Sequence, residues 1–229
     1  MLAHRIIPTL LYRGTTLVKG KGFDSTRSCG NIMQAAKIYS SREVDELILL
    51  DVSATPEGRT PNYSMIEKIC EDNFSPITVG GGVKSVDDVQ RLLNAGADKV
   101  AIGTKYDIIT ECADRFGNQA IVASMNVTDQ DAAMECLALE AMGAGEILLN
   151  SVERDGTMRG YDLDLIKRVC EAVEIPVIAS GGCSGYEDMI NALKAGASAV
   201  AAGALFQFTD CTPRGAAQYL HEHGVEVRI

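Results

Sequence analysis

The sequence predicts an α/β barrel in which eight parallel strands are each followed by a helix. Short aliphatic segments alternate with amphipathic ones along all 229 residues, and the two halves of the chain repeat each other. Strands that alternate with helices favour parallel pairing through right-handed crossovers. The length also suits one such barrel. We therefore expect residues 1–229 to form a single (βα)8 barrel domain of two half-barrels, roughly 1–115 and 116–229.

Eight segments have the length and aliphatic character of buried strands. They are residues 5–11, 46–51, 77–79, 99–103, 120–125, 146–150, 177–179 and 199–203. Amphipathic stretches with helical spacing lie between them, at 31–41, 64–70, 86–94, 132–142, 165–173, 186–194 and 215–223. This order predicts the alternation of strand and helix that a barrel of this class requires.

An internal repeat at an offset of 100 residues is the strongest observation for two similar halves. Residues 77–104 and 177–204 align without gaps and share ten identities: Gly81, Gly82, Asp88, Leu93, Ala95, Gly96, Ala97, Val100, Ala101 and Gly103. Repeats of this size indicate duplicated structural units. An open, doubly wound sheet is the alternative architecture, but it does not predict this symmetry.

Composition limits the classes of partner. The formal net charge of −10 argues against nucleic acid and anionic membranes. No apolar stretch approaches the ~20 residues that span a bilayer, and the N-terminus does not resemble a signal peptide. Seven scattered cysteines without a CxxC pair favour reduced thiols over disulfides or zinc. We therefore expect a cytoplasmic protein with no metal and no cofactor. Cys183 has no neighbouring base, which favours a packing role.

Each repeat carries glycine-rich turns after two consecutive strands, where exposed backbone N–H groups favour a phosphate. A lone pair of glycines often makes only a tight turn, but two related copies favour phosphate binding. They also suggest an elongated ligand with a phosphate at each end. The predicted phosphate-binding residues are Gly81, Gly82, Gly103, Thr104, Gly181, Gly182, Gly203 and Ala204.

Polar residues follow the strands at the same predicted mouth. Asp51 ends the second strand and is the best-placed carboxylate for proton transfer. Asn126 ends the fifth strand. Asp155 is as well suited to shaping its turn as to contacting a ligand. The segment at 19–22, which contains Lys19, either orders over an anion or forms a flexible loop.

Four charged residues stand at strand starts: Arg5, Glu46, Lys99 and Glu146. Strand alternation allows all four to point along the barrel axis at the N-terminal face. Buried charges of this kind lower stability unless every member is paired. From their spacing alone, a structural ion-pair network is favoured over a functional one.

Several specific stretches carry a resemblance to a known family: MLAHRII, VDELILLDVSA, ITVGGGV, GADKVAIGT, GAGEILLNSVERDGT, GYD, PVIASGG and HGVEVRI. On these, essentially the entire chain resembles the cyclase subunit of imidazole glycerol phosphate synthase. In that family the barrel docks on a glutaminase at its N-terminal face. Ammonia then crosses a charged gate and the barrel to reach a bisphosphorylated substrate at the opposite mouth.

The resemblance implies roles for particular residues. It makes the four strand-start charges an ammonia gate, which replaces the purely structural interpretation, and it places Asp98 at the glutaminase interface. It also implies phosphate binding at the glycine turns, and it carries over Lys19, Asp51 and Asp155 as site positions. The expected partners are a glutaminase subunit and a phosphorylated small molecule, in a heterodimer.

This sequence differs from the family at the positions that carry out the catalytic chemistry. Leu11 and Asn126 occupy the positions of the family's two catalytic aspartates, and neither side chain exchanges a proton near neutral pH. Loss of one general acid or base lowers the rate by ~10²–10⁴. The family's hairpin after the fifth strand also has no counterpart at 126–131. With IPxLL at residues 7–11, the chain resembles a divergent branch linked to surface sugars. That branch implies ammonia transfer to a separate amidotransferase that builds an acetamidino sugar.

Three functions follow from these observations. The first is an ammonia-conducting subunit that serves sugar amidation. The second is a genuine histidine-pathway cyclase that uses Asp51 or Asp155 instead of the usual aspartates. The third is a non-catalytic, phosphate-binding scaffold. A sugar-phosphate isomerase barrel shares the repeat, but it requires its own pair of mouth aspartates and lacks the gate, so it ranks last.

Overall fold

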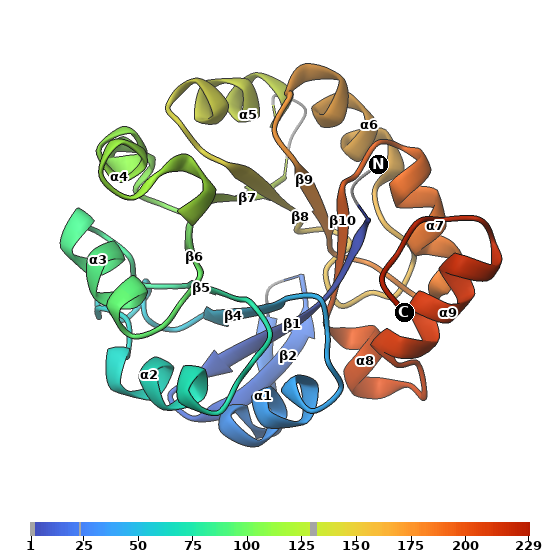
Figure 1. Ribbon diagram of the computed structural model, residues 1–229, viewed down its shortest axis with the longest axis horizontal. Coiled ribbons are helices and arrows are strands. Elements are labelled where there is room, and N and C mark those ends of the chain that lie inside the picture. The colour runs from blue at the N-terminus through green and yellow to red at the C-terminus, as the bar shows by residue number, and fades with distance from the viewer. Residues whose placement is uncertain (1–2, 23, 129–131) are drawn as a thin grey trace.

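The computed structural model describes residues 3–22, 24–128 and 132–229, which form a closed barrel of eight parallel strands (Figure 1). Consecutive barrel strands are neighbours, and the last pairs with the first through Arg5↔Ala199. The predicted fold class is therefore confirmed. The barrel strands are β1 (Arg5–Arg13), β4 (Leu47–Asp51), β5 (Ile77–Gly80), β6 (Lys99–Ile102), β7 (Ile121–Val127), β8 (Glu146–Ser151), β9 (Val177–Ser180) and β10 (Ala199–Ala202).

Helices form an outer ring around these strands (Figure 1). They are α1 (Ile32–Ser40), α2 (Tyr63–Glu71), α3 (Val86–Asn94), α4 (Ile109–Phe116), α5 (Ala132–Ala141), α6 (Leu163–Ala172), α7 (Tyr186–Lys194), α8 (Ala204–Phe208) and α9 (Pro213–Glu222), with short 3₁₀ turns at Tyr106–Ile108 and Asn118–Ala120. The sequence did not indicate α4 or α8. None of the described helices has the length and apolar character needed to cross a bilayer.

The first loop is an antiparallel hairpin, which the sequence analysis did not foresee. Its strands are β2 (Thr16–Lys21) and β3 (Asp24–Asn31). β1 is long enough to leave the barrel and pair with β2, through Leu11↔Val18, while it still pairs with β4. The Val18 side chain is buried, and this burial attaches the hairpin to the rest of the protein. Residues 19–21 therefore belong to a strand and not to a loop, which corrects the flexible-loop alternative.

Strand alternation divides the core into two separate layers. Side chains on one face of each strand fill the barrel interior, in a cluster of Ile7, Ile48, Ala101, Val122, Leu148, Ile178, Ala199 and Ala201. Side chains on the other face pack against the helices in a larger cluster. The interior cluster contains only aliphatic side chains, four of them no larger than alanine or valine. The barrel axis is therefore lined by apolar groups of modest size.

The repeat at an offset of 100 residues has a direct structural counterpart. Asn62 and Asp162 cap the N-termini of α2 and α6 through the backbone N–H groups of Met65 and Leu165. Gly96 and Gly196 both adopt positive φ, at +99° and +112°. A β-carbon on either glycine would lie 2.7 or 2.8 Å from the Cβ of Cys70 or Cys170, respectively. At equivalent positions, the two halves therefore use the same residue types to allow the same close contact.

We expect Gly96→Ala and Gly196→Ala each to lower the free energy of unfolding by about 2–4 kcal/mol, because a β-carbon adds backbone strain and overlap with the cysteine. Urea denaturation of each variant tests this. Gly185→Ser is the matched control, because Gly185 has extended backbone and nothing within 4 Å of a β-carbon. It should leave stability unchanged or slightly raised through N-capping. Equal stability of all three variants would contradict the packing account.

Candidate functional site

The four charged residues at the strand starts form a closed ring of ion pairs. Arg5 contacts Glu46 at 2.6 Å and Glu146 at 2.9 Å. Lys99 Nζ lies 3.0 Å from both glutamates, so the charges alternate around the ring. Thr78 Oγ1 donates to the remaining oxygen of Glu46 at 2.6 Å. The sequence indicated the four charged residues but not the contribution of Thr78.

Because the ring is largely buried, each charged side chain in it depends on its partners for stabilisation. The Glu46 side chain is only 2% exposed, so it depends on its two cations and Thr78 for stabilisation. Burial alone would lower the pKa of the Arg5 guanidinium, but Glu146 and Glu46 outweigh that effect and raise it. The ring pairs two cationic side chains with two carboxyl side chains in alternation, so its formal charges balance.

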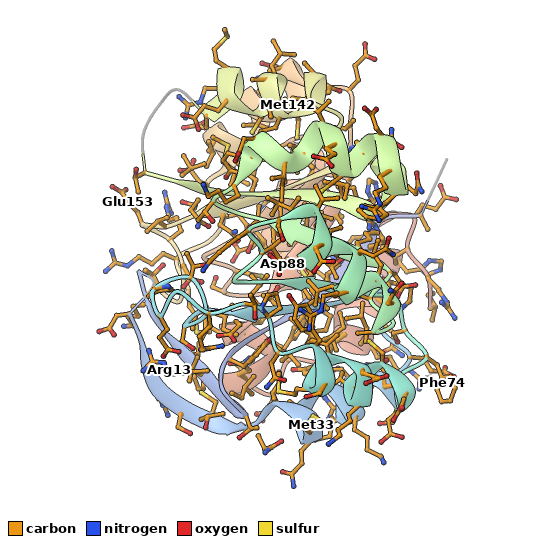
Figure 2. All side chains as sticks on the ribbon, turned by 90° about the vertical axis from the view of Figure 1, so that its left-hand side faces the viewer. Arg13, Met33, Phe74, Asp88, Met142 and Glu153 are labelled. Carbon is orange, nitrogen blue, oxygen red and sulfur yellow. The ribbon has the colours of Figure 1, made fainter. Side chains whose placement is uncertain are left out.

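The ring closes one end of the aliphatic barrel interior, and a cavity of about 420 Å³ opens at the other end. Ala101 and Ala201 belong to both the interior cluster and the cavity lining. Ring, aliphatic interior and cavity thus follow one another along the barrel. In Figure 2, Arg13 and Glu153 mark the cavity end, while Phe74 marks the opposite end, where the strands begin.

Every residue predicted to bind phosphate lines this cavity: Gly81, Gly82, Gly103, Thr104, Gly181, Gly182, Gly203 and Ala204. So do Leu11, Lys19, Asp51, Asn126 and Asp155. These turns require glycine where their backbone passes close to the end of a neighbouring strand. Gly181 has φ +94°, and a β-carbon there would lie 2.7 Å from the Ser151 carbonyl oxygen. The backbone of these turns therefore packs tightly against the neighbouring strands and also lines the cavity. Phosphate binding at the turns stays a prediction.

Lys19 reaches from the hairpin across the mouth of the cavity. Its Nζ donates to Asp155 Oδ1 at 2.5 Å, and the Gly22 N–H donates to the Asp155 carbonyl oxygen at 2.9 Å. Lys19 is only 4% exposed although it belongs to an extended hairpin. A β-carbon on Gly203 would lie 3.9 Å from its Nζ. The hairpin thus places one buried cation beside the turn that follows β10.

Asp51 is buried and heavily engaged by its own loop. Its Oδ1 accepts from the backbone N–H groups of Ser53 and Ala54 and from the Ser53 hydroxyl. Its Oδ2 accepts from both terminal nitrogens of Arg59 at 3.3 Å. Along β4, Ile48 belongs to the barrel interior, so Asp51 has the opposite parity. This geometry organises the loop, and the proton-transfer role of Asp51 stays a prediction.

The two positions that depart from the family motif lie across the same mouth. Leu11 is half-buried on β1, and Asn126 is exposed on β7. Asn150 Nδ2 donates to Asn126 Oδ1 at 3.2 Å and to Ser124 Oγ at 3.4 Å. This network consists of neutral amides and a hydroxyl, which do not ionise near neutral pH. Of the short connection after β7, residues 129–131 lie outside the described residues.

The sequence did not indicate several polar residues of the cavity lining, among them Thr9, Ser124 and Ser180. Each has the same strand parity as the interior residues, since Thr9 follows Ile7 by two positions along β1. That parity was the available signal, but single hydroxyl residues inside aliphatic strands are common. Thr9 Oγ1 is buried and has no hydrogen-bond partner among the described residues.

Asp98 lies at the opposite end of the barrel, next to the ring. It is exposed, and its Oδ2 accepts from the Ile77 backbone N–H at 2.8 Å. One oxygen therefore anchors the start of β5. The role of Asp98 at a partner interface stays a prediction. Within residues 3–22, 24–128 and 132–229, no three His, Cys, Asp or Glu side chains gather as a metal site would require.

Burial raises the pKa of the Cys183 thiol to about 12, although Cys183 lines the cavity. The thiol is therefore protonated at neutral pH, and we expect iodoacetamide to leave it unmodified. Labelling should rise about tenfold per pH unit toward that pKa, because the thiolate is the reactive form. Peptide mapping by mass spectrometry measures this, with the urea-unfolded chain as control. Rapid labelling of the folded chain at neutral pH would contradict the packing role.

The family model described as "Histidine biosynthesis protein" matches residues 5–212. This match spans β1 to the segment before α9, and it includes the ion-pair ring, both pairs of glycine turns and the hairpin that carries Lys19. A match over most of the chain establishes the family, and the chain therefore belongs to the histidine biosynthesis protein family.

Proposed function

We propose that the chain is the ammonia-accepting barrel subunit of a glutamine-dependent amidotransferase. One contrast carries this proposal. The ring of four charges at the start of the strands is complete, whereas both carboxylates among the described residues that line the cavity at the other end are already engaged. Asp51 is engaged by Ser53, Ala54 and Arg59, and Asp155 is paired with Lys19.

The barrel interior suits a small neutral molecule. Beyond the ring, the lining is aliphatic as far as Ala101 and Ala201 at the bottom of the cavity. Transfer of an ion into such surroundings is far less favourable than transfer of a neutral molecule. The interior therefore favours ammonia over ammonium. Because the ring carries charges of both signs without net charge, its members can exchange partners as a small polar molecule passes.

The expected glutaminase docks at the ring end of the barrel. Phe74, in the loop before β5, is 95% exposed there (Figure 2). An exposed aromatic side chain beside a charged entrance suits an interface anchor, since aromatic residues are enriched at interface hot spots. The exposed Asp98 carboxylate next to β6 adds a charged contact point on the same face.

The fate of the ammonia follows from the departures at the other mouth. With Leu11 and Asn126 in place of two aspartates, cyclisation lacks its proton-transfer groups. The resemblance to the divergent branch supports an acceptor in surface-sugar synthesis, where a separate amidotransferase builds an acetamidino group. Family membership itself favours a second candidate, a histidine-pathway cyclase that relies on Asp51 or Asp155.

A coupled assay distinguishes these candidates. The purified chain is mixed with its cognate glutaminase, glutamine and the bisphosphorylated histidine-pathway substrate. We expect the chain to stimulate glutamine hydrolysis without forming imidazole glycerol phosphate, because the acid–base pair is missing. Product at a cyclase-like rate would instead establish the histidine function. Absence of both binding and stimulation would overturn the amidotransferase proposal.

The Lys99→Met variant separates conduction from a scaffold role in the same assay. It leaves Glu46 and Glu146 with one cation between them, so the ring should rearrange and the coupling to the glutaminase should fall. The Lys37→Met variant is the matched control, because Lys37 is exposed on α1. Unchanged coupling in folded Lys99→Met would favour the scaffold.

The proposed docking face yields a separate prediction. We expect Phe74→Asp to weaken glutaminase binding by roughly tenfold or more, since hot-spot truncations typically cost at least about 2 kcal/mol. The melting temperature should not change, because the side chain makes little contact with its own chain. Calorimetric titration measures the affinity. Met134→Asp, an exposed position on α5, should bind normally, and equal affinities of the two variants would argue for docking elsewhere.

A further inference from the structure

One helix of the outer ring, α5, is apolar on the side that faces solvent. It lies between α4 and α6 in the ring (Figure 1). Met134 is 71% exposed and Leu137 is 43% exposed, and among the described helices only α5 exposes two large apolar side chains. Ala138 and Ala141 are also exposed. Residues three, four and seven positions apart share one side of a helix, so these four residues form a single surface, the α5 stripe.

The half-barrel repeat shows that the barrel itself does not require this apolar surface. At the offset of 100 residues, the α1 segment corresponds to α5 and carries, at the four stripe positions, Gln34, Lys37, Ile38 and Ser41. All four are exposed, as their counterparts are on α5. The barrel-facing positions also correspond, since Ala36 and Cys136 are both buried. Three positions that meet solvent are therefore polar in one half and apolar in the other.

The stripe carries no charge, which matters for contact between two copies of this chain. With a formal net charge of −10, two copies repel each other over most of their surfaces. Of the two acidic residues in α5, Glu140 is directed towards the segment before β9, because its Oε1 accepts from the backbone N–H groups of Glu174 and Ile175. Glu135 lies beside the stripe and not within it. The α5 stripe therefore offers a contact whose centre is neutral.

The order of side-chain sizes along the stripe is complementary to its own reverse. The large side chains of Met134 and Leu137 come first, and Ala138 and Ala141 follow. When two α5 helices meet antiparallel about a twofold axis between residues 137 and 138, Met134 faces Ala141 of the second copy, and Leu137 faces Ala138 of the second copy. Each large side chain then packs against a small one, as close helix packing requires. A parallel pair would place alanine against alanine and leave a gap.

We propose that the α5 stripe is the contact surface of a twofold homodimer in which the two α5 helices pack antiparallel. Contacts of this symmetry require a surface that is complementary to itself, and the α5 stripe meets that requirement. It extends ~10 Å along the helix, so the contact is small and the dimer is weak and reversible. Because α5 belongs to the outer wall of the barrel, the dimer leaves the ring end and the cavity of each copy accessible.

Sedimentation velocity of the purified chain, from micromolar to near-millimolar concentration, tests for the dimer. The weight-average mass should rise from that of one chain towards that of two. Met134→Asp should keep the mass of one chain throughout, because it places a charge in each half of the apolar contact. Its melting temperature should not change, since Met134 is exposed. A wild-type chain that stays monomeric, or a Met134→Asp variant that still dimerises, would overturn the proposal.

Exchange of a large and a small residue tests the antiparallel packing. Met134→Ala and Ala141→Met should each weaken the dimer by about tenfold or more, since each change acts twice in a twofold contact, the first by a gap and the second by overlap. The double variant, Met134→Ala with Ala141→Met, exchanges the two sizes and should dimerise within about threefold of the wild type. Gln34→Met, the equivalent position on α1, is the control and should leave the equilibrium unchanged.

The same series separates a specific contact from general apolar adhesion. Ala141→Met enlarges the exposed apolar surface, so adhesion alone would strengthen association in this variant. Stronger association of Ala141→Met, or failure of the double variant to recover, would overturn the antiparallel dimer. None of these measurements requires glutaminase or glutamine. Loss of this proposal and loss of the amidotransferase proposal are therefore separate results.

Discussion

Pairing of β10 with β1 is the constraint on which the rest of this molecule depends. It closes the sheet and fixes the register of every strand, so that residues of one parity all face the axis. Arg5, Ile7 and Thr9 thereby become successive levels of one interior. The charged ring, the aliphatic interior and the polar cavity are consequences of this single alternation.

The ring illustrates how burial links distant segments. Glu46 is almost inaccessible to solvent and contacts Arg5, Lys99 and Thr78, which come from three other strands. Removal of any one partner would leave buried charge without compensation. The ring supplies the charged entrance that the proposed function requires.

Duplication and divergence act on different parts of the two halves. Positions where the backbone requires glycine are shared by the two halves. Gly96 packs closely on Cys70, and Gly196 packs in the same way on Cys170. Side chains that face the cavity differ, since Asp51 is matched by Ser151 and Thr55 by Asp155. The backbone scaffold is therefore symmetric, whereas the side chains at its mouth differ between the two halves.

The sequence by itself determined the barrel, its eight strands to within about two residues, the repeat and the residues at each mouth, because hydrophobic periodicity and glycine spacing are local signals. It did not determine the hairpin, because β2 and β3 depend on β1 extending beyond the barrel. Only the tertiary structure brought Lys19 to Asp155 and Gly203, and only it engaged both oxygens of Asp51. Those contacts join segments distant along the chain, or depend on loop geometry that no periodic pattern encodes.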